Sequence, residues 1–242
     1  MKEEMLEMLE VGEENKGGRY LMNRWLFKIL SSAVTPIGGD VLEIGTGGST
    51  TGMAMYGRGD YHFVPTDVHV GDKYPYTLPE VVQFDVLNPA CDLIKTFPQW
   101  DLILCNQVLE HLPEVRLAVR NMYNLLKVGG VLVITTPFMY RIHETDPGTG
   151  IVEEDMKDYW RFTPSGLDLI LSNSGFTEYS VGKVCNRPDA MMNPEICMAI
   201  ARRTPTDEKQ PFQWTPTLPG DWYETLQAWD YEYRERVGML KL

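Results

Sequence analysis

The residues best suited to hold a charged organic ligand lie in a short glycine-rich segment. Residues 41–49 read Val-Leu-Glu-Ile-Gly-Thr-Gly-Gly-Ser, an apolar run that carries one acid and then breaks into glycines. Glycine lets the backbone turn sharply and approach a ligand closely, because it has no Cβ. A turn of this kind at the carboxyl end of a strand is where open α/β sheets hold nucleotide-like ligands. The segment therefore predicts a strand, a tight turn at Gly45 and Gly47, and the start of a helix.

Two further acids follow apolar runs, and their positions suit the binding of the ribose and the base of an adenosine. Asp67 ends the run 63–66 and comes 22 residues after Gly45, where a carboxylate can accept hydrogen bonds from both ribose hydroxyls. Asp85 ends the run 81–84 and can accept a hydrogen bond from the exocyclic amine of an adenine, with Val86 in apolar contact with the adenine ring. The alternative for both acids is an ordinary turn aspartate.

Alternating strand and helix signals through residues 38–204 predict the elements that position these acids. The expected strands are Asp40–Ile44, Tyr61–Thr66, Val81–Asp85, Leu102–Cys105, Val131–Thr135, Thr177–Val184 and Ile196–Arg202. Helices are expected over Leu112–Lys127, ending at Gly129-Gly130, and over Ser165–Ser174, after the cap Thr163-Pro164. This alternation predicts a mostly parallel sheet covered on both faces. The last two strands are joined by a loop and are expected to form an antiparallel hairpin.

Three segments in the right order resemble one family. They are Glu43-x-Gly45-x-Gly47-x-Ser49, Trp100–Leu112 with its Glu-His turn, and Leu125–Pro137 with its Gly-Gly turn. Over roughly residues 38–202 the chain resembles class I S-adenosylmethionine-dependent methyltransferases, with Ser49 where the family has its third glycine. The resemblance implies an α/β, Rossmann-like, seven-stranded mostly parallel sheet with an antiparallel edge hairpin and helices on both faces. It also implies an enzyme with S-adenosyl-L-methionine as its cofactor.

The resemblance assigns the methionine end of the cofactor to the glycine turn. Backbone groups of Gly45, Thr46 and Gly47 are expected to contact the methionine moiety, with Glu43 near its amino group. These groups would hold the polar end of the cofactor at the first strand.

The resemblance assigns the rest of the cofactor to the following strands. Asp67 is expected to bind the ribose, and Asp85 and Val86 the adenine. Asn106 and Gln107 are expected to flank the sulfonium. His111 is expected beside the cofactor, with a substrate contact as the alternative.

The long loop after Pro137 suggests how the acceptor is handled. Its histidine followed by Asp-Tyr-Trp-Arg-Phe-Thr-Pro at 158–164 resembles methyltransferases of sugar and cell-surface glycan pathways. The resemblance implies a small-molecule acceptor, such as a hydroxyl of a sugar or glycan precursor. His143 is the expected base because imidazole titrates near neutral pH, and Tyr140, Arg141 and Tyr159 are expected substrate contacts. The alternative for His143 is a polar surface residue.

Two other functions remain as alternatives. One is a non-catalytic S-adenosylmethionine-binding regulatory protein. The other is a metal-dependent RNA 2′-O-methyltransferase, since that family has Glu-x-x-Glu-His where this chain has Gln107-Val-Leu-Glu110-His111. Gln107 removes one carboxylate ligand, and magnesium or manganese sites favour carboxylates, so no metal is expected.

Charge and cysteine content restrict the partners and the setting. The net charge of −12 over 242 residues disfavours nucleic acid and an anionic membrane surface. The N-terminus has no signal-peptide pattern, and no apolar run reaches the length of a membrane span. The four cysteines lack metal-type spacing, and Cys105 and Cys197 are expected buried and reduced. A cytoplasmic protein fits these features.

The chain is expected to divide into residues 1–204, a methyltransferase domain with an N-terminal helical segment, and residues 205–242. The second part combines a Pro-rich strap with an aromatic helix, whose apolar residues recur at helical spacing. This helix is expected to pack on the domain. The alternative is a lid or a homodimer contact made by the terminal helices.

Overall fold

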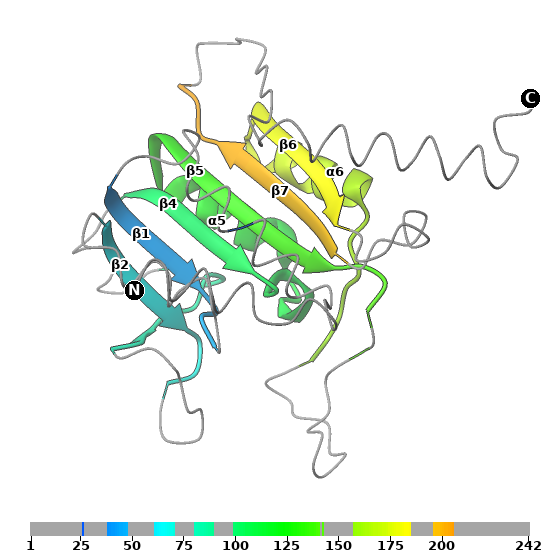
Figure 1. Cartoon of the computed structure of the whole chain (residues 1–242), viewed down its shortest axis with the longest axis horizontal. Helices are drawn as coiled ribbons and strands as arrows, with labels where there is room; N and C mark the ends of the chain where they lie inside the picture. The colour runs from blue at the N-terminus through cyan, green and yellow to red at the C-terminus, as the bar shows by residue number, and fades with distance from the viewer. Residues whose placement is uncertain are drawn as a thin grey trace, which may run out of the picture.

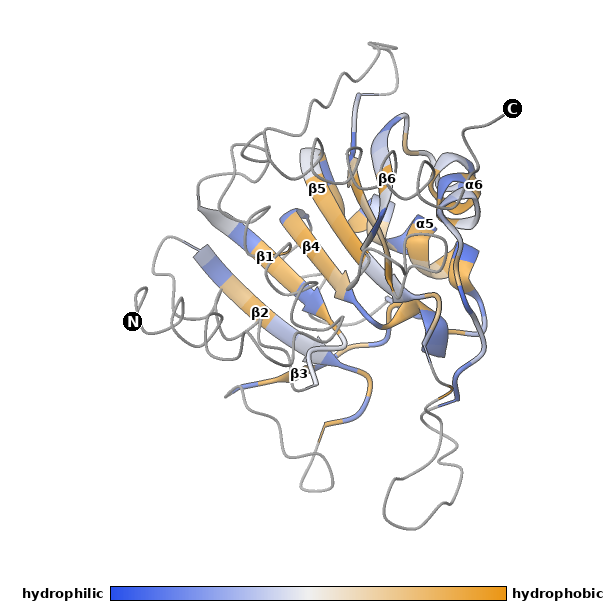
Figure 2. Cartoon of the chain, turned by 45° about the vertical axis from the view of Figure 1, so that its right-hand side comes forward, coloured by the Kyte–Doolittle hydropathy of each residue, from blue (hydrophilic) through white to orange (hydrophobic). Residues whose placement is uncertain are grey.

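The fold is built on one seven-stranded sheet. The computed structural model describes residue 26 and residues 38–47, 61–70, 80–89, 99–140, 142, 157–184 and 196–205. The strands are β1 (Gly39–Ile44), β2 (Tyr61–Asp67), β3 (Val82–Gln83), β4 (Trp100–Asn106), β5 (Leu126–Pro137), β6 (Glu178–Val184) and β7 (Ile196–Arg202). Their order across the sheet is β3-β2-β1-β4-β5-β7-β6. Figure 1 shows this order from β2 to β6, and Figure 2 labels β3 beside β2.

Strand directions follow the expected pattern. Each pair from β3 across to β5 is parallel, whereas β7 runs antiparallel to both β5 and β6. The predicted mostly parallel sheet with an antiparallel edge hairpin is therefore confirmed. The chain reverses its winding between β1 and β4, which are neighbours, and this reversal is where open α/β sheets place their ligands.

Buried apolar side chains lie on both faces of the sheet, so the central strands are mostly apolar, with hydrophilic residues toward their ends (Figure 2). On one face, α5 (Val115–Leu125) and α6 (Pro164–Ser174) pack against side chains that include Ile103 and Leu132. On the other face, the helical residue Leu26 is buried in a cluster with alternate residues of the same strands. Burial on both faces explains why the strands read as continuous apolar runs rather than as alternating patterns.

Helices α5 and α6 begin and end for different reasons. Thr163 caps α6 as predicted: its hydroxyl accepts a hydrogen bond from the Gly166 N–H at 3.1 Å, and Gly175 ends the helix at φ 107°. The prediction for α5 is wrong at both ends, because the helix begins at Val115 and ends at Leu125. Leu126 is already extended and pairs with Trp100 across the sheet, so strand pairing ends the helix before the glycines do.

Strand register brings the functional candidates to one edge of the sheet. Ile44 of β1 lies opposite both Thr66 of β2 and Cys105 of β4, and Asn106 of β4 lies opposite Thr135 of β5. The carboxyl ends of these strands therefore meet in one row.

Several expectations concern residues that the structure does not describe. Apart from the helical residue Leu26, the terminal helices lie outside the described residues, as do the strap, Cys91 and Cys185. Cys105 and Cys197 are buried free thiols, as expected. Within the described segments, no helix has the length and apolar character needed to cross a membrane.

Candidate functional site

The glycine turn after β1 is held by hydrogen bonds to the neighbouring strand. The Thr46 N–H donates to the Thr66 carbonyl at 2.9 Å, and the Thr46 hydroxyl donates to Oε2 of Glu43 at 2.7 Å. Glu43 is buried at the end of β1, so its carboxylate fixes the turn from beneath. Gly45 at φ 67° and Gly47 at φ 40° adopt the left-handed backbone that glycine tolerates best.

The two glycines of this turn face different surroundings. A Cβ on Gly45 would lie 2.4 Å from Cγ2 of Val108, so this glycine allows close packing inside the protein. A Cβ on Gly47 would meet no atom of the described residues within 4 Å, so among these residues this part of the turn borders open space. An open, backbone-lined turn of this kind suits a ligand that approaches the main chain closely.

Asp67 lies directly beside the open turn. Its Oδ2 accepts a hydrogen bond from the Gly47 N–H at 3.4 Å, and its Oδ1 accepts one from the His69 N–H at 3.3 Å. Both distances are at the long end of the range for N–H···O hydrogen bonds, so both carboxylate oxygens keep capacity for further donors. The chemistry of this group fits the paired hydroxyls of a ribose.

Asp85 closes the turn after β3. Its Oδ1 accepts from the Leu87 N–H at 2.8 Å, and its carbonyl accepts from the Asn88 N–H at 3.1 Å, as in a turn aspartate. Its Oδ2 accepts no hydrogen bond from the described residues and keeps the capacity to bind an amine. The side chain of Val86 is buried in the core, and its carbonyl accepts from Nδ2 of Asn121 at 2.8 Å.

The ends of β4 and β5 share a polar network. The Thr135 hydroxyl donates to Oδ1 of Asn106 and accepts a hydrogen bond from Nε2 of Gln107 at 3.2 Å. The Gln107 N–H also donates to the Thr135 carbonyl at 2.9 Å, although Gln107 has a left-handed φ of 57°. The structure thus brings together the two residues expected near the sulfonium, and it adds Thr135, which the sequence analysis did not single out.

A short turn after β4, η1 (Leu109–His111), carries a histidine and a buried acid. Nδ1 of His111 lies 2.9 Å from the Lys157 carbonyl, and its Nε2 lies 3.9 Å from Oε1 of Glu110. Neither carboxyl oxygen of Glu110 has a hydrogen-bond partner among the described residues. Burial raises the pKa of Glu110 to about 8; Asp158 adds to the rise and Arg161 opposes it. Sequence reasoning missed this burial because residues distant in sequence produce it.

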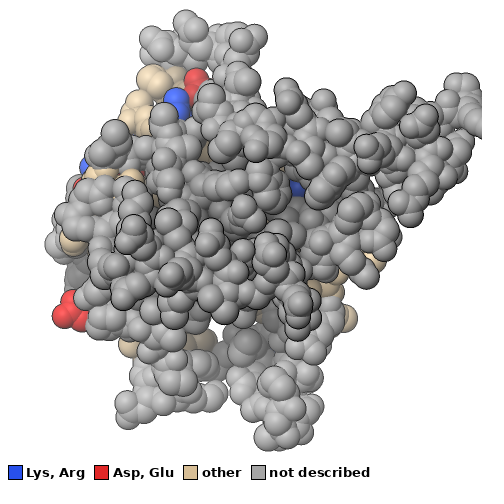
Figure 3. Space-filling model, in the orientation of Figure 1, with Lys and Arg blue, Asp and Glu red and all other residues tan. Residues whose placement is uncertain are grey.

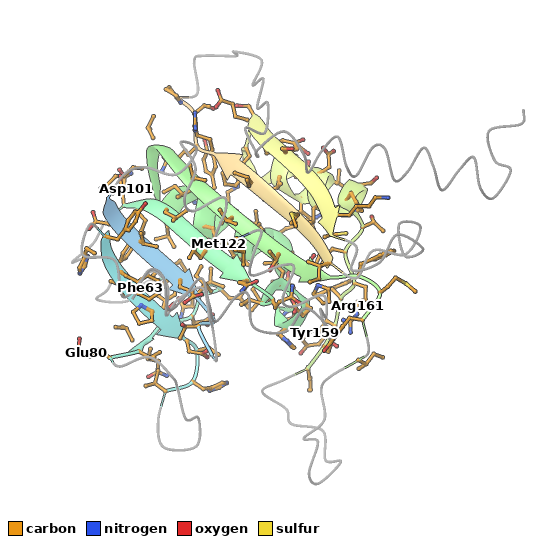
Figure 4. The ribbon with its side chains drawn as sticks, in the orientation of Figure 1. Phe63, Glu80, Asp101, Met122, Tyr159 and Arg161 are labelled. Atoms are coloured by element: carbon orange, nitrogen blue, oxygen red, sulfur yellow. The ribbon has the colours of Figure 1, made fainter. Side chains whose placement is uncertain are left out.

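Residues 157–162 cover the turn. The Tyr159 N–H donates to the Glu110 carbonyl at 2.7 Å, and Nε1 of Trp160 donates to the Leu112 carbonyl at 2.8 Å. Figure 4 shows Tyr159 and Arg161 beside the carboxyl ends of β4 and β5. These bonds hold the segment against the same edge as the glycine turn.

The residues expected to contact the acceptor are only partly described. Tyr140 and Tyr159 are about half exposed, and Nε of Arg161 donates to the Tyr140 carbonyl at 3.3 Å. Arg141 and His143 lie outside the described residues. Within the described part of the chain, no group of three or more His, Cys, Asp or Glu residues is placed to hold a metal ion.

Comparison with known proteins identifies the family. The family model "Methyltransferase domain" matches residues 17–181. The ubiquinone biosynthesis O-methyltransferase of Psychrobacter arcticus is 26% identical over 160 residues, covering 60% of this chain but only 61% of that protein. The enzyme of the same name from Coxiella burnetii is 24% identical, covering 72% of this chain and 81% of that protein.

The fold agrees with a solved methyltransferase. The 1,6-didemethyltoxoflavin-N1-methyltransferase of Burkholderia thailandensis, solved with bound S-adenosylhomocysteine, superposes with a TM-score of 0.55 at 16% identity. The alignment covers 84% of this chain and 87% of that one. The chain belongs to the class I S-adenosylmethionine-dependent methyltransferases, which confirms the expected family and its cofactor. The open turn at Gly47 and the acceptor capacity of Asp67 fit that cofactor.

Proposed function

We propose that this chain transfers the methyl group of S-adenosylmethionine to a hydroxyl oxygen of a small organic molecule. The observation that carries the proposal is the junction of the open turn at Gly47 with the Asp67 carboxylate, at the point where the sheet reverses its winding. When bound, the cofactor supplies a methyl group already activated by its positive sulfonium. The task left to the protein is to hold the two reactants in line and to exclude water.

Oxygen as the accepting atom is supported by the relatives, whose names describe O-methyltransferases. A hydroxyl must lose its proton as its oxygen takes the methyl group, so a base at the acceptor side is required. We propose His143 for this role, because it follows the carboxyl end of β5 by six residues. Loops at that end of the strands build the sites of open α/β sheets.

The side chains near this edge favour an acceptor with an apolar or aromatic body. Those exposed after β5 and before α6 are Met139, Tyr140, Ile142, Tyr159 and Trp160. A contiguous exposed apolar patch is typical of a binding surface. A hydroxyl on an aromatic ring therefore fits better than the sugar or glycan hydroxyl suggested by sequence, which the comparisons do not support.

A nucleic-acid acceptor is a poorer fit. The whole chain carries a net charge of −12. On the face shown in Figure 3, the described Lys and Arg side chains are few and do not form one patch. Nucleic-acid binding depends on clustered cations that release counterions from phosphates.

The test is a methyl-transfer assay with isotopically labelled cofactor and two matched acceptor panels, one of phenols and catechols and one of sugars and sugar nucleotides. Mass spectrometry should find the labelled methyl on a hydroxyl oxygen of a member of the aromatic panel. Activity should survive a chelator, which would separate this chain from the metal-dependent RNA enzymes. Transfer to sugars alone, or to RNA, would overturn the proposed acceptor.

A further inference from the structure

The amide pair at the end of β4 is oriented by one hydroxyl. Thr135 is fully buried, and its single hydroxyl hydrogen goes to Oδ1 of Asn106. Because a threonine hydroxyl donates only once, its remaining bond to Gln107 must be accepted from Nε2, as observed at 3.2 Å. The two amides are therefore forced into opposite orientations by the same side chain.

This arrangement determines which atoms the pair presents outward. Oδ1 of Asn106 and Nε2 of Gln107 are occupied by Thr135, which leaves Nδ2 of Asn106 and Oε1 of Gln107 as the outer atoms. Neither outer atom has a hydrogen-bond partner among the described residues. The pair thus presents one donor and one carbonyl oxygen at the edge of the sheet that holds the glycine turn.

The backbone of Gln107 is held in an energetically unfavourable conformation. Its φ of 57° lies in the left-handed region, which is unfavourable for a residue with a side chain. Two hydrogen bonds to Thr135, one from the backbone N–H and one from the side chain, maintain it there. Strain that is held by specific bonds at a ligand site is typical of a functional position.

We propose that Thr135 is a positioning residue that turns the Gln107 carbonyl oxygen toward the positively charged sulfonium. The inference deepens the proposed function at the cofactor side of the same site. A carbonyl dipole aimed at this position stabilises S-adenosylmethionine, which carries the charge, but not S-adenosylhomocysteine, which is neutral. The network therefore gives the protein selectivity for cofactor over spent product.

The experiment compares the dissociation constants of S-adenosylhomocysteine and S-adenosylmethionine by calorimetry, without any acceptor. The ratio of interest is the dissociation constant of S-adenosylhomocysteine divided by that of S-adenosylmethionine, so a high ratio means selectivity for the cofactor. Thr135→Val keeps the side-chain shape but removes the hydroxyl. It should lower this ratio about five- to tenfold, the effect of one lost charge–dipole contact. Thr135→Ser keeps the hydroxyl and should leave the ratio within about twofold. Thr136→Val is the matched control, because Thr136 is the next residue, is also buried, and its hydroxyl has no partner among the described residues.

A second variant tests whether Thr135 acts through Gln107. Gln107→Met should lower the ratio as Thr135→Val does, and the double variant should lower it no further, because the two residues form one unit. An unchanged ratio in Thr135→Val, or in Gln107→Met if Thr135→Val fails to fold, would overturn the inference. An equal fall in Thr136→Val would also overturn it. Failure to methylate any aromatic hydroxyl would refute the proposed acceptor and leave these ratios measurable.

Discussion

The Gly47 N–H donates a hydrogen bond to Oδ2 of Asp67 over 3.4 Å, joining the turn after β1 to the end of β2. The bond is long, and the carboxylate is correspondingly free to turn toward a better donor. The contact therefore sets Asp67 in position without consuming its capacity to accept hydrogen bonds.

Removal of the Asp67 carboxylate should weaken cofactor binding. Asp67→Ala is expected to cost about 1–3 kcal/mol of binding free energy, because ribose hydroxyls would lose their acceptor on leaving water. Calorimetric titration with S-adenosylhomocysteine measures the change. Asp168→Ala, which removes an exposed acid from α6, is the control and should bind normally. If Asp67→Ala bound S-adenosylhomocysteine as tightly as the parent chain, Asp67 would not bind the ribose.

The two glycines of the turn should respond differently to alanine. Gly45→Ala should be strongly destabilised, because its Cβ would lie 2.4 Å from Cγ2 of Val108, and the second substitution Val108→Ala should restore part of the loss. Gly47→Ala should lose only the roughly 1–3 kcal/mol of a strained backbone, yet bind the cofactor much more weakly. Urea unfolding with and without S-adenosylhomocysteine separates the two effects. Normal cofactor binding by Gly47→Ala would contradict a close approach of the ligand to this turn.

The free energy of unfolding should decrease as the pH rises, because of Glu110. An unfolded glutamate has a pKa near 4.3, whereas burial raises the pKa of Glu110 to about 8 in the folded chain. Between these values only the unfolded chain releases the proton, so a rise in pH favours unfolding. Glu110→Gln should therefore gain stability over the parent chain from pH 5 to pH 8, by at most about 1.4 kcal/mol per pH unit.

Urea unfolding of the parent chain and Glu110→Gln at several pH values measures this difference. The exposed-site variant Glu114→Gln should track the parent chain at every pH. A constant offset between Glu110→Gln and the parent chain would show that the carboxyl is ionised in the folded state throughout.

The proposed base gives a kinetic prediction. His143→Ala should lower turnover by roughly 10²–10⁴ while leaving cofactor affinity nearly unchanged, because a base acts on the acceptor and not on cofactor binding. His62→Ala is the control, since His62 lies near the amino end of β2 and contacts Asp40 at 3.3 Å. If both substitutions changed turnover by the same small amount, His143 would be an ordinary surface residue and not the base.

The sequence was sufficient for the strands but not for every boundary. Apolar runs are a strong local signal, and they located all seven strands of the sheet, with the edge hairpin. The signal was weaker at the bounds: β3 is only Val82–Gln83 and is exposed, and β5 begins five residues before the expected Val131. The end of α5 was misplaced because Leu126 is as suitable for a helix as for a strand. Its pairing with Trp100, distant in the chain, decides between them.

The site was predictable where residue type and position carry the chemistry. Asp67 ends its strand as expected and accepts a hydrogen bond from the glycine turn. Thr135 carried no local signal that separates it from an ordinary strand residue, and the Glu-His turn gave no sign that Glu110 is buried. The burial of Glu110 depends on the cover of residues 157–162, and the role of Thr135 depends on its network with Asn106 and Gln107. Neither set of contacts is local in sequence.

The position of β7 between β5 and β6 has a consequence for how the chain matures. β6 is synthesised before β7, yet β7 is its pairing partner in the sheet, and β7 also pairs with β5. While the ribosome is still adding residues before Ile196, β6 has no neighbour and the β5 edge is bare. Bare strand edges invite pairing with other chains. A nascent chain stalled before Arg202 is therefore a candidate for chaperone capture, and the sheet closes only when its last described strand emerges.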